Sequence, residues 1–236
     1  MAIKAVLFDL DGTLLPMDQN QFLKGYFGLL TEKMIKSGYD AKAFMKALLA
    51  GTDAMVINDG SRTNEKRFWE VFGSFYTPET LPPIALFDAF YAEDFQKTRA
   101  FCGYDARPRR IVDLVKEKGL LCVLATAPAF PAIATETRMG YVGLRPEDFV
   151  LYTTYENSTY CKPSEDYYRE VLRKIGCAPD ECLMVGNDVT DDIDPATAIG
   201  MQVFLLTDFL INKNGADIEK YPHGGYDELL SFIDAI

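Results

Sequence analysis

The sequence predicts an α/β fold, in which a doubly wound, mostly parallel sheet of the Rossmann-like type forms the core and an α-helical domain is inserted into it. Residues 3–10 form an almost continuously apolar run, which is typical of a strand buried on both faces. From residue 109 onward, strand and helix patterns alternate at the spacing of βαβ units. Between these two regions the strand pattern stops and aromatic-rich helix patterns follow, which predicts the insertion.

These patterns place the α/β core at residues 1–15 and 108–236, and the inserted helical domain at residues 16–107. The expected strands span residues 3–10, 120–125, 149–152, 183–185 and 202–206. The expected helices span residues 21–37, 41–50, 64–75 and 83–95 in the insertion, and residues 109–118, 131–139, 165–175, 192–199 and 226–236 in the core.

The composition narrows the class of protein. With 236 residues, 48% hydrophobic and 25% charged, the chain is long enough for a full core and has an ordinary globular composition. A net charge of -11 argues against nucleic acid or an anionic membrane as partner. No apolar run approaches the roughly 20 residues that span a bilayer, and the N-terminus reads as a strand rather than a signal peptide, so we expect a cytoplasmic protein.

The first expected strand ends on two carboxylates. Side chains alternate along a strand, so Asp9 and Asp11 share a face while Leu10 turns away. Gly12 gives the backbone freedom directly after the strand, and Thr13 adds a hydroxyl. Ligands of open α/β sheets bind at the carboxyl ends of the strands, which is where this pair falls.

Polar residues also follow two other expected strands and precede one helix. Thr126 and Ala127 come after strand 120–125 and can donate a hydroxyl and a backbone N–H to a phosphate oxygen. Lys162 precedes helix 165–175 and supplies a point charge suited to an anion. Strand 183–185 runs into an acidic loop that contains Asp188 and Asp192.

The carboxylates need a cation. Two unit charges about 4 Å apart repel by about 4 kcal/mol at an effective dielectric near 20, so Asp9, Asp11 and Asp188 at one site would repel strongly. Oxygen is the only ligand type that these residues offer, which favours Mg²⁺. The only histidine, His223, lies in an expected surface turn, and the five cysteines have no paired ligand spacing, so zinc and a Ser-His-Asp triad are disfavoured.

The four segments, in this order, resemble the four motifs of the haloacid dehalogenase superfamily of phosphatases, and the insertion lies where members with a type-one helical cap carry theirs. The resemblance implies that Asp9 is the nucleophile and Asp11 the general acid and base. It also implies that Lys162, Thr126 and Ala127 hold the phosphoryl oxygens. The implied Mg²⁺ would be bound by Asp9, the backbone carbonyl of Asp11 and an acidic residue of the fourth motif.

The fourth motif departs from the usual pattern, because Asn187 follows the glycine where many relatives have aspartate. Either Asn187 takes the usual position as a neutral ligand, or Asp188 restores a carboxylate. We favour Asp188, because a hard cation prefers an anionic ligand. In that alignment Asp192 would orient Lys162 or a metal-bound water.

The resulting hypothesis is a Mg²⁺-dependent phosphatase that acts on a small phosphorylated metabolite through an aspartyl-phosphate. A phosphomutase or a phosphonate hydrolase on the same scaffold stays open, and a non-catalytic binding or regulatory protein is less favoured. The substrate cannot be read from the chain. Loop residues that could contact its leaving group are Asn58, Arg62 and Asn64. Aromatic residues that could face either the core or a partner, leaving the oligomeric state open, are Phe68, Trp69 and Phe72.

Overall fold

A computed structural model describes residues 2–236. Its strands form one sheet of six, and every pairing between neighbours is parallel. The strand order is β3-β2-β1-β4-β5-β6, a doubly wound order, so the predicted fold class is confirmed. The strands are β1 (Ala5–Phe8), β2 (Leu121–Leu124), β3 (Leu151–Tyr152), β4 (Cys182–Gly186), β5 (Gln202–Leu206) and β6 (His223–Gly224).

Strand β1 lies at the centre of the sheet because both of its faces are apolar. Val6 and Phe8 belong to the hydrophobic cluster on one face, and Ala5 and Leu7 belong to the cluster on the other face. None of the four side chains is exposed. The strand pairs with β2 on one side and with β4 on the other, so the segment that follows it is held between two neighbouring strand ends.

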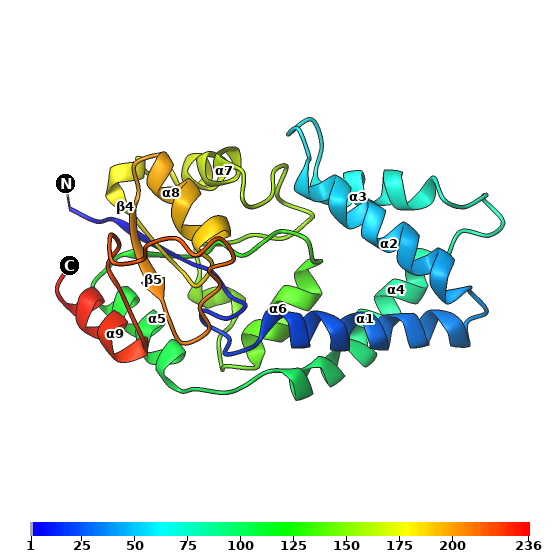
Figure 1. The fold of residues 1–236 in the computed structure, drawn as a ribbon, viewed down its shortest axis with the longest axis horizontal. Coiled ribbons are helices and arrows are strands. Elements are labelled where there is room, and N and C mark those ends of the chain that lie inside the picture. Colours follow the sequence, from blue (N-terminus) through cyan, green and yellow to red (C-terminus); the bar gives the residue numbers. More distant parts are fainter. Residues whose placement is uncertain (1) are drawn as a thin grey trace.

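Helices cover both faces of this sheet (Figure 1). The core helices are α5 (Arg107–Glu117), α6 (Ala132–Gly140), α7 (Glu165–Ile175), α8 (Asp194–Ala198) and α9 (Tyr226–Asp234). Helices α5 and α9 contribute Ile111 and Leu229 to the same cluster as Phe8. Helices α7 and α8 contribute Tyr167 and Ala196 to the opposite cluster.

The helices that follow β1 in the chain gather on one side of the sheet, at the right of Figure 1. They are α1 (Gln19–Lys36), α2 (Ala41–Val56), α3 (Asn64–Gly73), α4 (Ile84–Ala92) and the 3₁₀ helix η1 (Asp94–Phe101). Where the chain returns, the Gly103 N–H donates to the Pro16 carbonyl at 2.7 Å, so the outgoing and returning segments touch. The division of the chain into a core and an inserted domain of residues 16–107 stays a prediction. No helix within residues 2–236 is long and apolar enough to span a bilayer.

Several elements differ from the sequence-based expectation. The strand expected over 3–10 spans Ala5–Phe8, and the helix expected over 41–50 continues to Val56. The helix expected over 83–95 is two elements, α4 and η1. The helix expected over 192–199 starts earlier, as a π-helical turn, η4 (Val189–Ile193), whose first N–H groups are accepted by the Asp188 side chain. His223, expected in a surface turn, begins β6, since the Leu205 N–H donates to the Pro222 carbonyl at 2.9 Å and extends the sheet.

Candidate active site

The segment after β1 is fixed between two strands. The Asp9 N–H donates to the Val185 carbonyl at 2.9 Å, and the Ala125 N–H donates to the Phe8 carbonyl at 2.7 Å. Asp9 therefore lies level with the carboxyl ends of β2 and β4. In a doubly wound sheet the crevice between the strands where the winding reverses is the common ligand site, and β1 and β4 flank it here.

Lys162 joins Asp9 to Asp192. Its Nζ lies 2.8 Å from Asp9 Oδ1 and 2.6 Å from Asp192 Oδ1, and all three side chains are buried. Burial by itself lowers the pKa of the Lys162 ammonium, but the Asp192 and Asp9 carboxylates raise it well above its ordinary value. Lys162 is therefore charged, and its ammonium donates to the Asp9 carboxylate at the carboxyl end of the sheet.

Asp192 also braces the loop that follows β4. Its Oδ2 accepts the N–H groups of Asn187 at 3.1 Å and of Asp188 at 3.0 Å. This close packing needs a glycine at position 186, because a Cβ there would lie 2.3 Å from Asp192 Cγ. Asp192 thus fixes Lys162 and also the backbone of Asn187 and Asp188, the two candidate metal ligands of the sequence analysis.

Asn187 uses both ends of its amide within the protein. Its Oδ1 accepts from the Thr13 hydroxyl at 3.0 Å, and its Nδ2 donates to the Phe209 carbonyl at 2.7 Å. Gly12, at φ +86°, allows this approach, since a Cβ there would lie 2.5 Å from Asn187 Nδ2. The amide therefore ties the first motif to the fourth.

Asp188 has a different environment. Its Oδ1 accepts the N–H groups of Thr190 at 2.8 Å and Asp191 at 3.1 Å. Within residues 2–236, hydrogen bonds reach only one carboxylate oxygen of Asp188 and only one of Asp9. Each side chain thus keeps a second oxygen that could bind a cation.

The local charge balance and the donor set fit a divalent cation. Three buried carboxylates, those of Asp9, Asp188 and Asp192, lie in this region with one lysine. All the available donors are oxygens, which suits Mg²⁺. No group of three or more His, Cys, Asp or Glu side chains with metal-binding geometry occurs within residues 2–236. A metal here would need backbone or water oxygens beside two carboxylates.

Asp11 is paired with an arginine that the sequence analysis did not identify. Asp11 Oδ2 forms an ion pair with Arg138 Nη1 of α6, and Asp11 Oδ1 is buried without a hydrogen-bond partner. Burial raises the pKa of the Asp11 carboxyl above its ordinary value, although the Arg138 guanidinium opposes that shift. Arg138 itself is fully buried, and its guanidinium lies 4.3 Å from the centre of the Phe130 ring.

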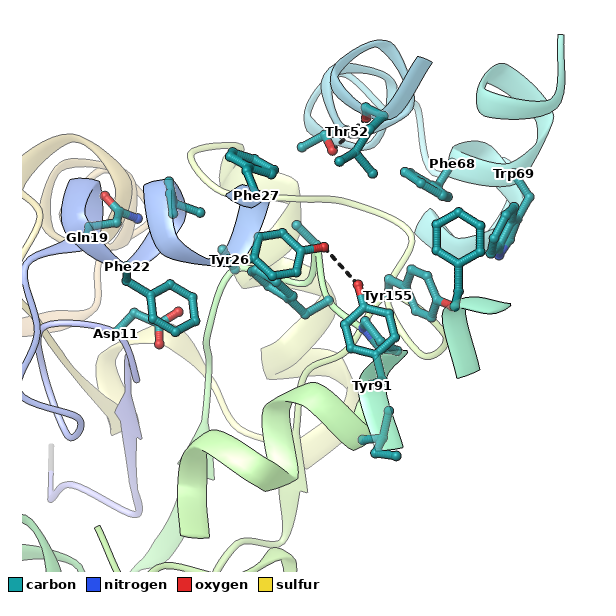
Figure 2. A pocket seen from close by; sticks show the side chains of 18 of the residues that line it. Asp11, Gln19, Phe22, Tyr26, Phe27, Thr52, Phe68, Trp69, Tyr91 and Tyr155 are labelled. Carbon is teal, nitrogen blue, oxygen red and sulfur yellow. Dashed lines mark hydrogen bonds between the residues drawn. The ribbon is translucent and has the colours of Figure 1, made fainter. Parts of the chain in front are cut away.

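A cavity of about 250 Å³ opens from this pair into the helices that follow β1 (Figure 2). Asp11 and Ala127 both line it. Thr126, one residue earlier, is buried, and its carbonyl accepts the Tyr167 hydroxyl at 2.9 Å, which fixes the chain after β2. The structure thus brings Asp11 and Ala127 to one cavity, and Asp9, Lys162 and Asp192 to one hydrogen-bonded group.

The loop residues suggested as leaving-group contacts do not line this cavity. Asn64 is fully buried, and its amide donates to the Pro128 and Tyr160 carbonyls, so its role is to hold the loop. Arg62 is exposed and pairs with Glu70 at 2.5 Å. The sequence could not show which of these loop residues contacts a substrate, because the partners of the Asn64 amide, the Pro128 and Tyr160 carbonyls, are distant in the chain.

Comparisons with known proteins agree with this fold. Residues 3–200 match the family model of haloacid dehalogenase-like hydrolases. The mouse haloacid dehalogenase-like hydrolase domain-containing protein 2 is 39% identical over 103 residues, which are 40% of this chain and 38% of that protein. A glyceraldehyde 3-phosphate phosphatase of Methanothermobacter thermautotrophicus is 38% identical over 64 residues, 24% of this chain and 28% of that protein. The chain thus spans less than two fifths of the length of these two relatives.

A solved structure extends the likeness of the fold to nearly the whole chain. The structure of a phosphatase from Thermococcus onnurineus superposes with a TM-score of 0.60 at 18% identity and covers 98% of both chains. The family model matches well over half of the sequence, and the same segment contains Asp9, Lys162 and Asp192. The chain belongs to the haloacid dehalogenase-like hydrolases.

Proposed function

We propose that this hydrolase is a Mg²⁺-dependent phosphatase that cleaves a small phosphomonoester through an aspartyl-phosphate on Asp9. The observation that carries the proposal is the buried ion pair of Asp9 and Lys162, whose charged atoms lie 2.8 Å apart. Asp11, two residues after Asp9 in the chain, lines a cavity. A carboxylate nucleophile beside a fixed cation suits attack on an anionic phosphorus centre. The likeness to a protein named glyceraldehyde 3-phosphate phosphatase supports phosphate ester hydrolysis.

In the proposed first step, one Asp9 oxygen attacks phosphorus as the bond from phosphorus to the leaving oxygen breaks. Asp11, whose pKa burial raises above its ordinary value, gives a proton to that oxygen and becomes the carboxylate that pairs with Arg138. In the second step, Asp11 takes a proton from a water molecule that attacks the phosphoryl group, which releases phosphate and restores Asp9. The Lys162 ammonium, the Thr126 hydroxyl and the Ala127 N–H would hold the phosphoryl oxygens as charge moves between them.

The proposed metal ligands are the carboxylates of Asp9 and Asp188 and the backbone carbonyl of Asp11. Asp188 is favoured over Asn187, because the Asn187 amide is already bonded at both ends. When bound, Mg²⁺ would shield the anionic nucleophile from the anionic substrate. Asp192 would orient Lys162, to which it is hydrogen-bonded at 2.6 Å.

Phosphate release from a panel of phosphate monoesters and acetyl phosphate tests this function. We expect turnover with Mg²⁺, loss of turnover after EDTA treatment and recovery when Mg²⁺ is restored. No release from any substrate by the folded, Mg²⁺-loaded protein would contradict the proposal.

Two related activities have their own readouts. A phosphomutase would need an activating bisphosphate, so dependence on that additive would separate it from a phosphatase. A phosphonate hydrolase would need a lysine that forms a Schiff base near the reacting group, and the described residues that line the cavity include no lysine. The phosphatase therefore remains the better-supported function.

Asp188→Asn and Asn187→Ala should separate metal binding from loop structure. If Asp188 is the ligand, Asp188→Asn raises the Mg²⁺ concentration for half-maximal activity by roughly tenfold or more, because a hard cation loses an anionic oxygen. Asn187→Ala removes hydrogen bonds to Thr13 and Phe209, so it should lower the melting temperature while leaving that concentration nearly unchanged. A Mg²⁺ titration of both variants, with the reverse order of effects, would show that Asn187 is the ligand.

A further inference from the structure

The cavity beside Asp11 has an unusual lining. Nine of its nineteen lining residues are aromatic, whereas aromatic residues make up 13% of the whole chain. Figure 2 shows Asp11 and Phe22 at one end and Phe68 and Trp69 at the other. The sequence did not show whether Phe68, Trp69 and Phe72 face the core or a partner. In the structure Phe68 and Trp69 line the cavity, and Phe72 is buried.

The polar groups in the lining are largely satisfied by the protein itself. The Tyr26 and Tyr91 hydroxyls bond to each other at 2.9 Å, and the Thr52 hydroxyl donates to the Leu48 carbonyl at 3.0 Å. Exceptions in the lining are Asp11 Oδ1, which is buried without a hydrogen-bond partner within residues 2–236, and the polar side chains of Gln19 and Asp88. Along the rest of the wall, a polar group would lose hydrogen bonds with water without replacing them.

The charges of the lining exclude a second anion. The charged residues that line the cavity are Asp11 and Asp88, and the lining contains no Lys, Arg or His. Arg138 does not line the cavity; it lies over the Phe130 ring, is fully buried and is already paired with Asp11. A carboxylate or a second phosphate in the cavity would therefore find no cation among the described lining residues to pair with.

From these observations we infer that the cavity holds the leaving group of the substrate, and that this group is a mainly apolar ring or branched chain that carries no negative charge. The inference rests on the proposed phosphatase function. An apolar cavity of about 150 Å³ can hold benzene, so a cavity of about 250 Å³ has room for one ring with a small substituent. The substrate class is thus a phosphomonoester of an apolar alcohol, rather than a sugar bisphosphate or a phosphorylated acid.

Benzyl phosphate and 4-carboxybenzyl phosphate form a matched pair that tests the inference, since they differ by one carboxylate far from the phosphate ester. We expect kcat/KM to be roughly tenfold or more higher for benzyl phosphate. Thr52→Arg adds a cation to the cavity wall and should reduce or reverse that preference. Thr197→Arg makes the same change at an exposed position of α8 outside the cavity, and should keep the wild-type ratio. Equal kcat/KM values for the two esters would overturn the inference.

Binding provides a readout that does not depend on turnover. Trp69 is the only tryptophan in the chain and lines the cavity, so its fluorescence should change when benzylphosphonate binds and should change much less with 4-carboxybenzylphosphonate at the same concentration. Acetyl phosphate, which has almost no leaving group to fill the cavity, reports on the phosphatase function alone. Turnover of acetyl phosphate with no preference between the benzyl ligands would refute only the cavity inference. Selective benzylphosphonate binding with no turnover of any ester would refute the phosphatase, and with it the leaving-group assignment, while the apolar selectivity of the cavity would stand.

Discussion

Asp9→Asn is expected to abolish phosphate release, with kcat lower by roughly four orders of magnitude or more, because the amide is a far weaker nucleophile than the carboxylate. The fold should survive. The amide oxygen can still accept from Lys162, and Lys162 keeps Asp192 as its counter-ion at 2.6 Å. Activity on acetyl phosphate, with circular dichroism and thermal unfolding of the same samples, measures both expectations.

The matched control is Asp234→Asn, which makes the same change on an exposed residue at the end of α9. It should retain wild-type turnover and melting temperature. Near-normal phosphate release by Asp9→Asn would rule out a covalent mechanism on this residue.

The second large effect concerns stability. Asp11→Ala should lower the free energy of unfolding by roughly 3–5 kcal/mol, because it leaves the fully buried Arg138 guanidinium without its counter-ion. Within residues 2–236, Asp11 is the carboxylate that pairs with Arg138. The double variant Asp11→Ala/Arg138→Met removes the stranded charge and puts an apolar chain against Phe130, so it should recover most of that loss.

Urea unfolding of the two single variants and the double variant forms a double-mutant cycle that isolates the pair. The exposed pair of Arg62 and Glu70 is the control, and Glu70→Ala should change stability by less than about 1 kcal/mol. If Asp11→Ala were as mild as Glu70→Ala, Arg138 would not depend on Asp11. If the prediction holds, lost activity in Asp11 variants reflects both chemistry and folding, so stability must be measured beside turnover.

Elements with a strong local signal were predictable from the sequence. Strand β5 and helix α7 begin and end where the apolar and amphipathic patterns place them, and Gly176 ends α7 in the left-handed conformation. The position of Asp9 at the carboxyl end of a central strand was predictable for the same reason, because residues 5–8 are all apolar and such a strand is buried on both faces.

Features that depend on distant contacts were not predictable. Strand β6 has two residues, too few for any periodic pattern, and exists because Pro222 extends the edge of β5. Arg138 reads as an ordinary surface residue of a helix, and only the folded chain shows that Asp11 neutralises it. The direction in which Phe68 and Trp69 face was likewise set by tertiary packing, because an aromatic helix face can cover a core or line a cavity equally well.

The contact between Pro16 and Gly103 has a consequence for how this protein could be rebuilt. A single hydrogen bond of 2.7 Å joins the two residues, and a Cβ at position 103 would lie 3.2 Å from the Pro16 carbonyl oxygen. The whole segment between them therefore starts and finishes at one place, the geometry in which insertions and deletions are best tolerated. We therefore expect that this segment can be exchanged as a unit, which would replace most of the aromatic residues that line the cavity while leaving Asp9, Lys162 and Asp192 in place.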